Sequence, residues 1–433
     1  MFIEYPLVKG AYSSISAGDT EDIKCIAHYT STEVLDFILT SATFRATNLL
    51  YLNDAEEYIV GIDYIKKQLE KEAQTNNVDL SVVNQLFDSA LNIEDFKREA
   101  GVYTISFSNN EDLLSQWITY AKESGVSIIL DEELLLKEDD CPFYFVNKGI
   151  NEEGQRYEPF FKTSSVLKVL KYIKTDGAVN VNDFNKKLAE LYKDPEGTKN
   201  NLKQVVMATQ MQASYLKNDS FKEEHEIRAS FYPCEQYYSR SRLKNESKIK
   251  YQITPKSVIR PYMEIQFSIS EKENKECKKP CLPLKIITIG PSGTQQTIFD
   301  SVVHRLKYGD CKVYDYYSHR GDGRFYSNFV NYVKFVDKWM KQKGLSIDNG
   351  TNYSGLLSND LIKELYGGIL QMEVENKTLA TILLAQWENS LSNRVGSIDI
   401  PPKIKCLLGS INRNFHFSKQ GIIIKKSKIP YIF

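Results

Sequence analysis

Histidine and tryptophan are scarce in this sequence, which has five and three of them among 433 residues. The usual signatures of phosphate-binding loops are absent, because no GxGxxG follows an expected strand and no GxxxxGK[ST] occurs. Rossmann and P-loop nucleotide sites are therefore excluded at the level of sequence. The chain also lacks HExxH and HxE…CxxC patterns, so its spacing does not indicate zinc catalysis. No apolar run reaches the length of a membrane span.

The seven cysteines are scattered along the chain and odd in number. No secretory signal peptide precedes them, so we expect reduced thiols in a cytoplasmic protein. Cys277 and Cys281 are four residues apart, but no second pair of Cys or His follows at zinc spacing. We therefore expect no metal site.

The composition is that of a globular protein with a substantial core, at 42% hydrophobic and 26% charged residues. The formal net charge of -1 excludes a chain that binds nucleic acid as a polycation. Two segments are locally basic, residues 403–433 and the aromatic stretch YYSRSRLKNESKIKYQ at 237–252. Such patches are more often solvated surface than phosphate-binding surface, yet they slightly favour a nucleic-acid partner.

Hydrophobic periodicity predicts strands that alternate with helices in the first half of the chain. The predicted strands are 23–30, 101–108, 126–131, 223–232, 251–267, 284–290 and 421–433. The predicted helices begin after Thr30, after Asp54 and after Asn109, and include 75–100, 160–220 and 294–307.

Three helix starts carry expected caps. Thr30 with Glu33, and Asp54 with Glu57, have the spacing of a capping box. Asn109 is predicted to cap a helix on which Trp117 and Tyr120 share one face.

These patterns predict an α+β fold with a mixed β-sheet core, surrounding helices and a C-terminal helical insertion. We expect residues 1–310 to form a catalytic-like core. Residues 311–405 differ in composition, being rich in aromatic residues and asparagine, and are predicted to be the helical insertion. Residues 406–433 would return the last strands to the core.

Chemically useful side chains gather at the predicted ends of three strands. His28 and Tyr29 end the first, Ser106 lies near the end of the second, and Glu226 and Arg228 belong to a later one. Each of these residues taken alone is better explained by a structural role, as a buried histidine or as part of an ion pair along one strand, than by catalysis. Together they lack the activated nucleophile that acyl transfer needs. One rigid carboxylate instead suits cleavage of a glycosidic bond through an oxocarbenium-like transition state.

Several blocks of the sequence resemble one bacterial family of unknown function, DUF2971. They are IAHYTSTEVLDFILTSATFRATNLLYLNDAEEY, SFSNNEDLLSQWITYAKESGVSIILD, FKEEHEIR, IITIGP and KKSKIPY. The resemblance covers about residues 25–310 and 415–433, with Ala55 in place of the family's usual proline.

A looser resemblance to ADP-ribosyltransferases implies an activity, through a His-bearing first strand, a strand with a small hydroxyl and a later Glu-bearing strand. It implies that His28 contacts the ribose of NAD and that Tyr29 or Tyr120 stacks on nicotinamide. It also implies that Glu226 is catalytic, and Arg45 would meet the diphosphate as a bidentate donor. Further cofactor contacts are expected at Thr30, Asn53, Ser106 and Trp117. Contacts with the acceptor are expected at Arg228, Arg240, Arg242, Lys248 and Lys250.

The sequence thus leads us to expect an NAD-dependent ADP-ribosyltransferase that modifies a macromolecule, as a bacterial toxin or phage-defence effector. RNA is slightly favoured over protein as the acceptor. An antitoxin or chaperone would dock on residues 315–405. The toxin setting rests on the family resemblance alone.

Two alternatives stay open. One is a metal-dependent nuclease or other hydrolase with oxygen ligands from Asp54, Glu57, Asp112, Glu224 and Glu226. The other is a non-catalytic module that binds a partner. A transferase requires His28 and Glu226 at one site, a nuclease requires three carboxylates together, and a binding module requires neither.

Overall fold

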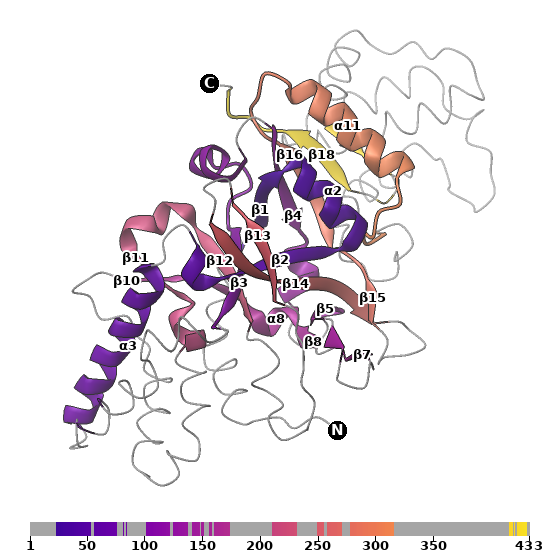
Figure 1. Cartoon of the computed structure of the whole chain (residues 1–433). Helices are drawn as coiled ribbons and strands as arrows, with labels where there is room; N and C mark the ends of the chain where they lie inside the picture. Colours follow the sequence, from indigo (N-terminus) through magenta and orange to yellow (C-terminus); the bar gives the residue numbers. More distant parts are fainter. Residues whose placement is uncertain are drawn as a thin grey trace, which may run out of the picture. The chain divides into compact units, whose positions relative to one another are not determined.

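A computed structural model gives the structure of the protein (Figure 1). It describes residues 23–52, 56–75, 81, 84, 101–121, 124–136, 141–147, 149–150, 156–157, 160–173, 210–231, 249–254, 258–270, 278–315, 415–418, 420 and 422–430. The chain divides into two compact units, and each is described by itself. Unit 1 comprises residues 1–284 and 311–313, and unit 2 comprises residues 285–310 and 314–433.

Unit 1 contains most of the described elements. Its helices are α2 (Thr32–Ser41), α3 (Glu56–Thr75), α6 (Leu114–Gln116), α7 (Glu132–Leu136) and α8 (Thr163–Val166), with 3-10 helices η2 (Leu49–Tyr51) and η5 (Asp219–Glu224) and a π-helix, η3 (Trp117–Ala121). Its strands are β1 (Ile26–Ser31), β2 (Thr43–Asn48), β3 (Tyr103–Ser108), β4 (Gly125–Leu130), β5 (Phe143–Asn147), β6 (Gly149–Ile150), β7 (Arg156–Tyr157), β8 (Phe160–Lys162), β9 (Leu167–Val169), β10 (Lys171–Ile173), β11 (Leu216–Asn218), β12 (Glu226–Phe231), β13 (Lys250–Ile253), β14 (Ile259–Ser270) and β15 (Lys278–Pro280).

The main sheet of unit 1 runs in the order β4–β1–β3–β2–β14–β5–β8. β12 pairs with β3 and with β9, while β13 and β15 both pair with β14. Each of these pairings is antiparallel. β12 is therefore hydrogen-bonded on both edges, which makes it a rigid support for the side chains it carries.

Unit 2 contains β16 (Leu284–Ile289) except for its first residue, together with α11 (Gln295–Tyr308), β17 (Phe415–Phe417) and β18 (Ile423–Lys426). β16 and β18 are parallel, whereas β17 and β18 are antiparallel. The helix predicted at 294–307 is confirmed as α11, and its buried residues Ile298, Val302 and Leu306 form one helical stripe. With sheets that mix pairing directions and helices between them, the predicted α+β class is confirmed.

The register of unit 1 gives its sheet two different faces. Ser108 pairs with Ala27 of β1 and with Glu226 of β12, and Ser106 pairs with Arg228. Directly paired residues project to the same side of a sheet, and successive residues alternate. We call the side that bears Glu226 and Arg228 the polar face. The opposite side, the apolar face, carries the next residues along each strand.

The apolar face holds the hydrophobic core of unit 1. Ring centroids of Phe145 and Phe267 are 4.4 Å apart, and those of Phe145 and Phe231 are 5.2 Å apart. Phe44 joins this cluster at 5.4 Å from Phe267. All four rings are at most 1% exposed. Each buried ring contributes about 1.5–3 kcal/mol, so this face supplies much of the stability of the unit.

The predicted cap of the first helix is wrong by one residue. Ser31, not Thr30, is the N-cap of α2, and its Oγ accepts a hydrogen bond of 3.3 Å from the amide of Val34. Thr30 belongs to β1 and is buried on the apolar face. The strand therefore continues one residue beyond the predicted start of the helix. Glu33 does not take the capping-box position.

The prediction of helix across 160–220 is wrong for most of the residues of this range that the structure describes. They form the strands β8, β9, β10 and β11, whereas α8 and residues 210–213 are helical. β9 pairs with β12, and β10 pairs with the distant β11 in parallel. These long-range pairings override the local helical pattern.

The segment after β3 differs from the predicted helix as well. The side-chain oxygen of Asn109 accepts hydrogen bonds from the amides of Lys24 and Cys25 and does not cap a helix. α6 and η3 follow, and the π-helix turns Trp117 and Tyr120 to different sides, with 2% and 46% of their surfaces exposed. The two residues do not share one face.

Several predictions lie outside the described residues. They include the Asp54 cap and all but the first five residues of the predicted insertion at 311–405. None of the helices in the described part of the chain combines the length and apolar character needed to cross a membrane. The four cysteines described, Cys25, Cys141, Cys281 and Cys311, form no disulfide with one another.

Candidate functional site

Glu226 is the first residue of β12, directly after a tight turn. η5 ends at His225, which adopts the left-handed backbone conformation with φ of 47°. The carbonyl of His225 accepts a hydrogen bond of 2.7 Å from the amide of Asn109, which ties this turn to the end of β3. The turn and the strand together fix where the Glu226 side chain leaves the backbone.

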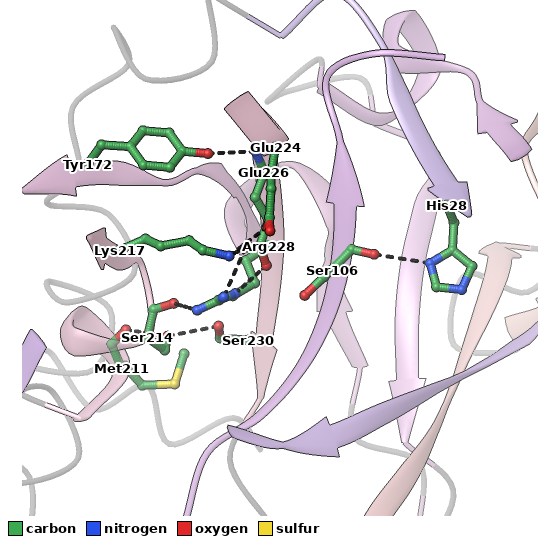
Figure 2. Close-up of polar contacts among 10 residues, drawn as sticks. All are labelled: His28, Ser106, Tyr172, Met211, Ser214, Lys217, Glu224, Glu226, Arg228 and Ser230. Carbon is green, nitrogen blue, oxygen red and sulfur yellow. Dashed lines mark hydrogen bonds and ion pairs between the residues drawn. The ribbon is translucent and has the colours of Figure 1, made fainter. Parts of the chain in front are cut away.

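Two cations hold the Glu226 carboxylate (Figure 2). Arg228 donates from Nε to Oε1 at 2.7 Å and from Nη2 to Oε2 at 3.0 Å, which is a bidentate contact with both carboxylate oxygens. Lys217 donates from Nζ to Oε2 at 2.7 Å. Such charge-assisted, bidentate contacts set the orientation of the carboxylate as well as its charge.

The surrounding groups anchor these cations in turn. Arg228 donates from Nη1 to the Ser214 carbonyl at 2.8 Å, and Lys217 also contacts Glu224 at 2.7 Å. The backbone amide of Glu226 donates to the hydroxyl of Tyr172 at 2.8 Å. We call Lys217, Glu224, Glu226 and Arg228 the Glu226 cluster. It contains two acids and two bases, and its charges balance.

A close approach of α3 supports the segment that brings Lys217 and Ser214 to Glu226. α3 packs beside β11 (Figure 1). A Cβ at Gly61 of α3 would lie 2.9 Å from the carbonyl oxygen of Ala213, closer than real Cβ atoms come to backbone oxygens. Glycine at this position therefore lets the helix approach the residues that supply the cluster.

The Glu226 carboxylate is ionised at neutral pH. Burial would raise its pKa, but the charges and hydrogen bonds of Arg228 and Lys217 outweigh burial and hold the pKa at about 2. Glu226 is 4% exposed, so the charge of its carboxylate lies in an environment from which water is largely excluded. A fixed negative charge of this kind interacts with a nearby developing cation more strongly than it would in water.

Tyr120 is the exposed aromatic residue near this cluster. Burial of its hydroxyl raises the pKa of Tyr120, and the charges of Glu224 and Glu226 raise it further. The phenol therefore stays protonated, while 46% of the residue remains exposed. Leu114 and Ile118 of the same segment are also exposed, at 36% and 50%. The segment that carries Tyr120 therefore exposes one aromatic and two apolar side chains.

His28 does not reach the Glu226 cluster, and the prediction that the two share one site is wrong. Ala27 is aligned with Glu226 through Ser108, so the next residue, His28, projects to the apolar face. Its ring lies edge-on to Phe44 and Phe107, at 5.1 and 5.8 Å between centroids. Figure 2 shows His28 on the other side of Ser106 from the cluster.

The environment of His28 favours a neutral imidazole. Burial lowers its pKa, against the opposing effect of a hydrogen bond to the Ser106 carbonyl. That bond joins Nδ1 to the carbonyl oxygen at 3.0 Å, and only a protonated Nδ1 can donate to it. His28 is therefore a structural link between β1 and β3.

Tyr29 and Trp117 are also structural residues, contrary to their predicted contacts with the cofactor. The Tyr29 hydroxyl donates to the Asn110 carbonyl and accepts from the Leu113 amide, both at 2.8 Å. Its ring meets that of Trp117 edge-on at 4.7 Å, and Trp117 donates from Nε1 to Asp112 at 2.8 Å. The two rings are 7% and 2% exposed, so neither offers a stacking surface.

The remaining predicted residues separate into three groups. Ser106 lies on the polar face opposite Arg228 and so belongs near the cluster. Arg45 and Lys250 lie on β2 and β13, where Arg45 donates to Gln252 and Lys250 pairs with Glu264. Asn53, Arg240, Arg242 and Lys248 are outside the described residues.

Sequence reasoning missed Lys217, Tyr172 and Ser214. All three belong to the range that was predicted to be helical, and their contacts with Glu226 and Arg228 depend on the folding of that segment onto β12. The EEHEIR block, which does mark a charged strand, is the nearest signal in the sequence.

Within the described part of the chain, no three His, Cys, Asp or Glu side chains are grouped so that they could hold a metal ion. The predicted ligands Glu224 and Glu226 instead share Lys217. Asp112 accepts the hydrogen bond from Trp117. The described residues therefore give no observation that favours a metal-dependent hydrolase.

A family model described as a protein of unknown function (DUF2971) matches residues 116–229. The predicted resemblance to this family is confirmed over that segment. The matched segment contains Tyr120, Tyr172, Lys217, Glu226 and Arg228, but neither His28 nor Arg45. No curated protein and no solved structure matches the chain.

Proposed function

We propose that this protein is an NAD-dependent ADP-ribosyltransferase in which Glu226 is the catalytic carboxylate. The observation that carries the proposal is a buried glutamate, ionised and held in one orientation by Arg228 and Lys217 on a doubly paired strand. In this reaction the bond between nicotinamide and ribose breaks and nicotinamide leaves. A bond then forms from the ribose carbon to a nucleophile of the acceptor, which releases a proton.

Glu226 would stabilise the positive charge that develops on the ribose as nicotinamide departs. A pre-oriented anion does this without reorganising during the reaction. Among the described residues, its Oε1 accepts one hydrogen bond, from Arg228 Nε. A carboxylate oxygen can accept a further hydrogen bond, so Oε1 is able to accept one from a ribose hydroxyl.

Tyr120 takes the stacking role in this proposal. It is the predicted stacking residue that is exposed near Glu226, and an aromatic ring beside two carboxylates suits a cationic pyridinium ring. Arg228, Lys217 and Tyr172 are positioning residues, since they act through Glu226. His28 has no part in the chemistry.

The acceptor that we propose is nucleic acid, with RNA slightly favoured over protein. The support is the basic and aromatic sequence of residues 237–252 and the basic residues 403–433. A toxin or phage-defence role in the cytoplasm, restrained by a partner on residues 315–405, completes the proposal and rests on family resemblance.

Transfer of label from NAD tests this function. Purified protein is incubated with NAD labelled in its adenylate part and with total cell extract, and parallel samples are treated with RNase, DNase or protease. We expect label in a macromolecule that RNase destroys, and none with Glu226→Gln. Glu33→Gln, which changes an exposed carboxylate on α2, is the matched control and keeps full transfer.

Cooperative thermal unfolding of both variants must be checked, because Glu226→Gln leaves Arg228 without its anionic partner. If NAD is neither consumed nor transferred by the folded wild-type protein with any extract, the proposal is wrong. Metal-dependent hydrolysis or partner binding would then replace it.

A further inference from the structure

Basic side chains from three strands gather on a second part of the polar face. In the strand register, Arg45 of β2 lies opposite Glu264 of β14, and Arg260 of β14 lies opposite Gln252 of β13. In the strand register, Lys250 of β13 lies opposite Tyr262 of β14, which is two residues from Arg260 and two from Glu264. Directly paired residues share one side of the sheet, as do residues two apart along a strand. We call Arg45, Lys250, Gln252 and Arg260 the basic face.

Arg45 is held in a defined orientation without a carboxylate partner among the described residues. Its Nη1 donates to Oε1 of Gln252 at 3.0 Å. Its guanidinium carbon lies 4.9 Å from the ring centroid of Tyr262 and 5.2 Å from that of Phe37. Stacking on two aromatic rings orders the guanidinium plane. Because the residue as a whole is exposed, its other N–H groups can donate to an external acceptor.

Arg260 has an unmet hydrogen-bond donor. Its Nε is buried and has no hydrogen-bond partner, and the residue forms no ion pair with the acids of the described residues. A buried donor without an acceptor costs about 1–3 kcal/mol. Gln252 is the strand partner of Arg260 and accepts the hydrogen bond from Arg45, so the two arginines have one neighbour in common.

The charges of the basic face do not cancel locally. Among the residues that the structure describes, Glu264 is the acid on this part of the sheet, and it forms an ion pair with Lys250 at 2.7 Å. Two guanidinium groups therefore remain for an external anion. Planar guanidinium forks match the geometry of phosphate oxygens.

We propose that the basic face binds phosphate groups of a nucleotide or nucleic-acid ligand through Arg45 and Arg260. The choice of ligand rests on the proposed function. In that function the phosphate groups belong either to the diphosphate of NAD or to the backbone of an RNA acceptor. Sequence reasoning assigned Arg45 to NAD and Lys250 to the acceptor. The structure joins them on one face.

Direct binding tests this site without turnover. The ligands are a fluorescently labelled single-stranded RNA of mixed sequence, followed by anisotropy, and NAD and inorganic pyrophosphate, followed by calorimetry. The protein is the full chain with Arg45→Gln and Arg260→Gln combined. The control combines Lys67→Gln and Lys71→Gln, which remove the same charge from exposed positions of α3.

We expect the basic-face variant to lose at least about tenfold in affinity either for RNA or for NAD and pyrophosphate, with a smaller salt dependence if the ligand is RNA. The control variant should bind as the wild-type protein does. Loss of RNA binding alone assigns the face to the acceptor, and loss of NAD binding alone assigns it to the diphosphate.

Equal affinity of the wild-type and basic-face proteins for RNA, NAD and pyrophosphate would overturn the proposal, as would the absence of any binding by wild type. If binding persists and turnover is never observed, the proposed transferase function fails while the phosphate site stands.

Discussion

Arg228 holds both carboxylate oxygens of Glu226, its neighbour two positions away on β12, with hydrogen bonds of 2.7 and 3.0 Å. Residues two apart on a strand project to the same face, so the strand itself presents the pair. Arg228 is 1% exposed and Glu226 is 4% exposed. The ion pair is therefore buried, and the consequences of breaking it are large.

Removing Arg228 should destabilise the protein more than removing the pair as a whole. Arg228→Met leaves the buried Glu226 with Lys217 alone, and loss of one partner of a buried pair costs about 3–5 kcal/mol. The combined variant Glu226→Leu and Arg228→Met should lose less, because no unpaired charge remains buried. Urea denaturation of both variants measures the difference. Equal losses would show that the pairing is energetically unimportant.

The ionisation of Glu226 predicts how stability depends on pH. The folded-state pKa of about 2 lies below the ordinary value of 4.5. Stability from this group is therefore present above pH 4.5 and is lost as pH falls from 4.5 toward 2. The full effect is about 3 kcal/mol, as an order of magnitude.

Denaturation by urea between pH 7 and pH 3 checks this dependence. Other carboxylates titrate in the same range, so the readout is the difference in slope between wild type and Glu226→Gln. The Gln variant should lose less stability on acidification. Parallel pH profiles for the two proteins would contradict the depressed pKa.

Tyr120 should matter for NAD binding and little for folding. Tyr120→Ala removes the exposed ring, and we expect its KM for NAD to rise by about tenfold, which corresponds to about 1.4 kcal/mol of lost stacking. Tyr120→Phe keeps the ring and should retain most of the affinity. Steady-state kinetics with both variants separates the ring from the hydroxyl. An unchanged KM in Tyr120→Ala would remove the residue from the site.

His28 should matter for folding and little for chemistry. His28→Ala deletes a ring packed against Phe44 and Phe107 and a hydrogen bond to Ser106, which predicts a loss of about 2–4 kcal/mol. The kcat of the folded fraction, measured at a temperature well below unfolding, should stay within about twofold of wild type. A large fall in kcat without a loss of stability would restore the cofactor role that the sequence implied.

The parts of the fold that were predictable are those whose signals are local. The strands at 101–108, 126–131 and 284–290 are apolar runs, and the structure has β3, β4 and β16 there with ends shifted by at most two residues. The shared face of Glu226 and Arg228 follows from alternation along one strand. It needs no information from elsewhere in the chain.

The face of His28 was not predictable, because it depends on which residue of β1 pairs with Ser108. A shift of one residue in that register would place His28 on the polar face with Glu226. Lys217 was missed for a similar reason, since β10 and β11 form by pairing with each other across a long stretch of sequence. Local periodicity carries no information about either contact.

Release of nicotinamide from NAD by the full chain in the presence of total RNA tests whether Glu226 is the catalytic carboxylate. The comparison is between wild type and Glu226→Gln, with Glu33→Gln as the control for an exposed carboxylate. We expect release by wild type and Glu33→Gln, and a fall of at least about 100-fold in the folded Glu226→Gln protein. Release at the same rate by Glu226→Gln would contradict the assignment of Glu226 as the catalytic carboxylate.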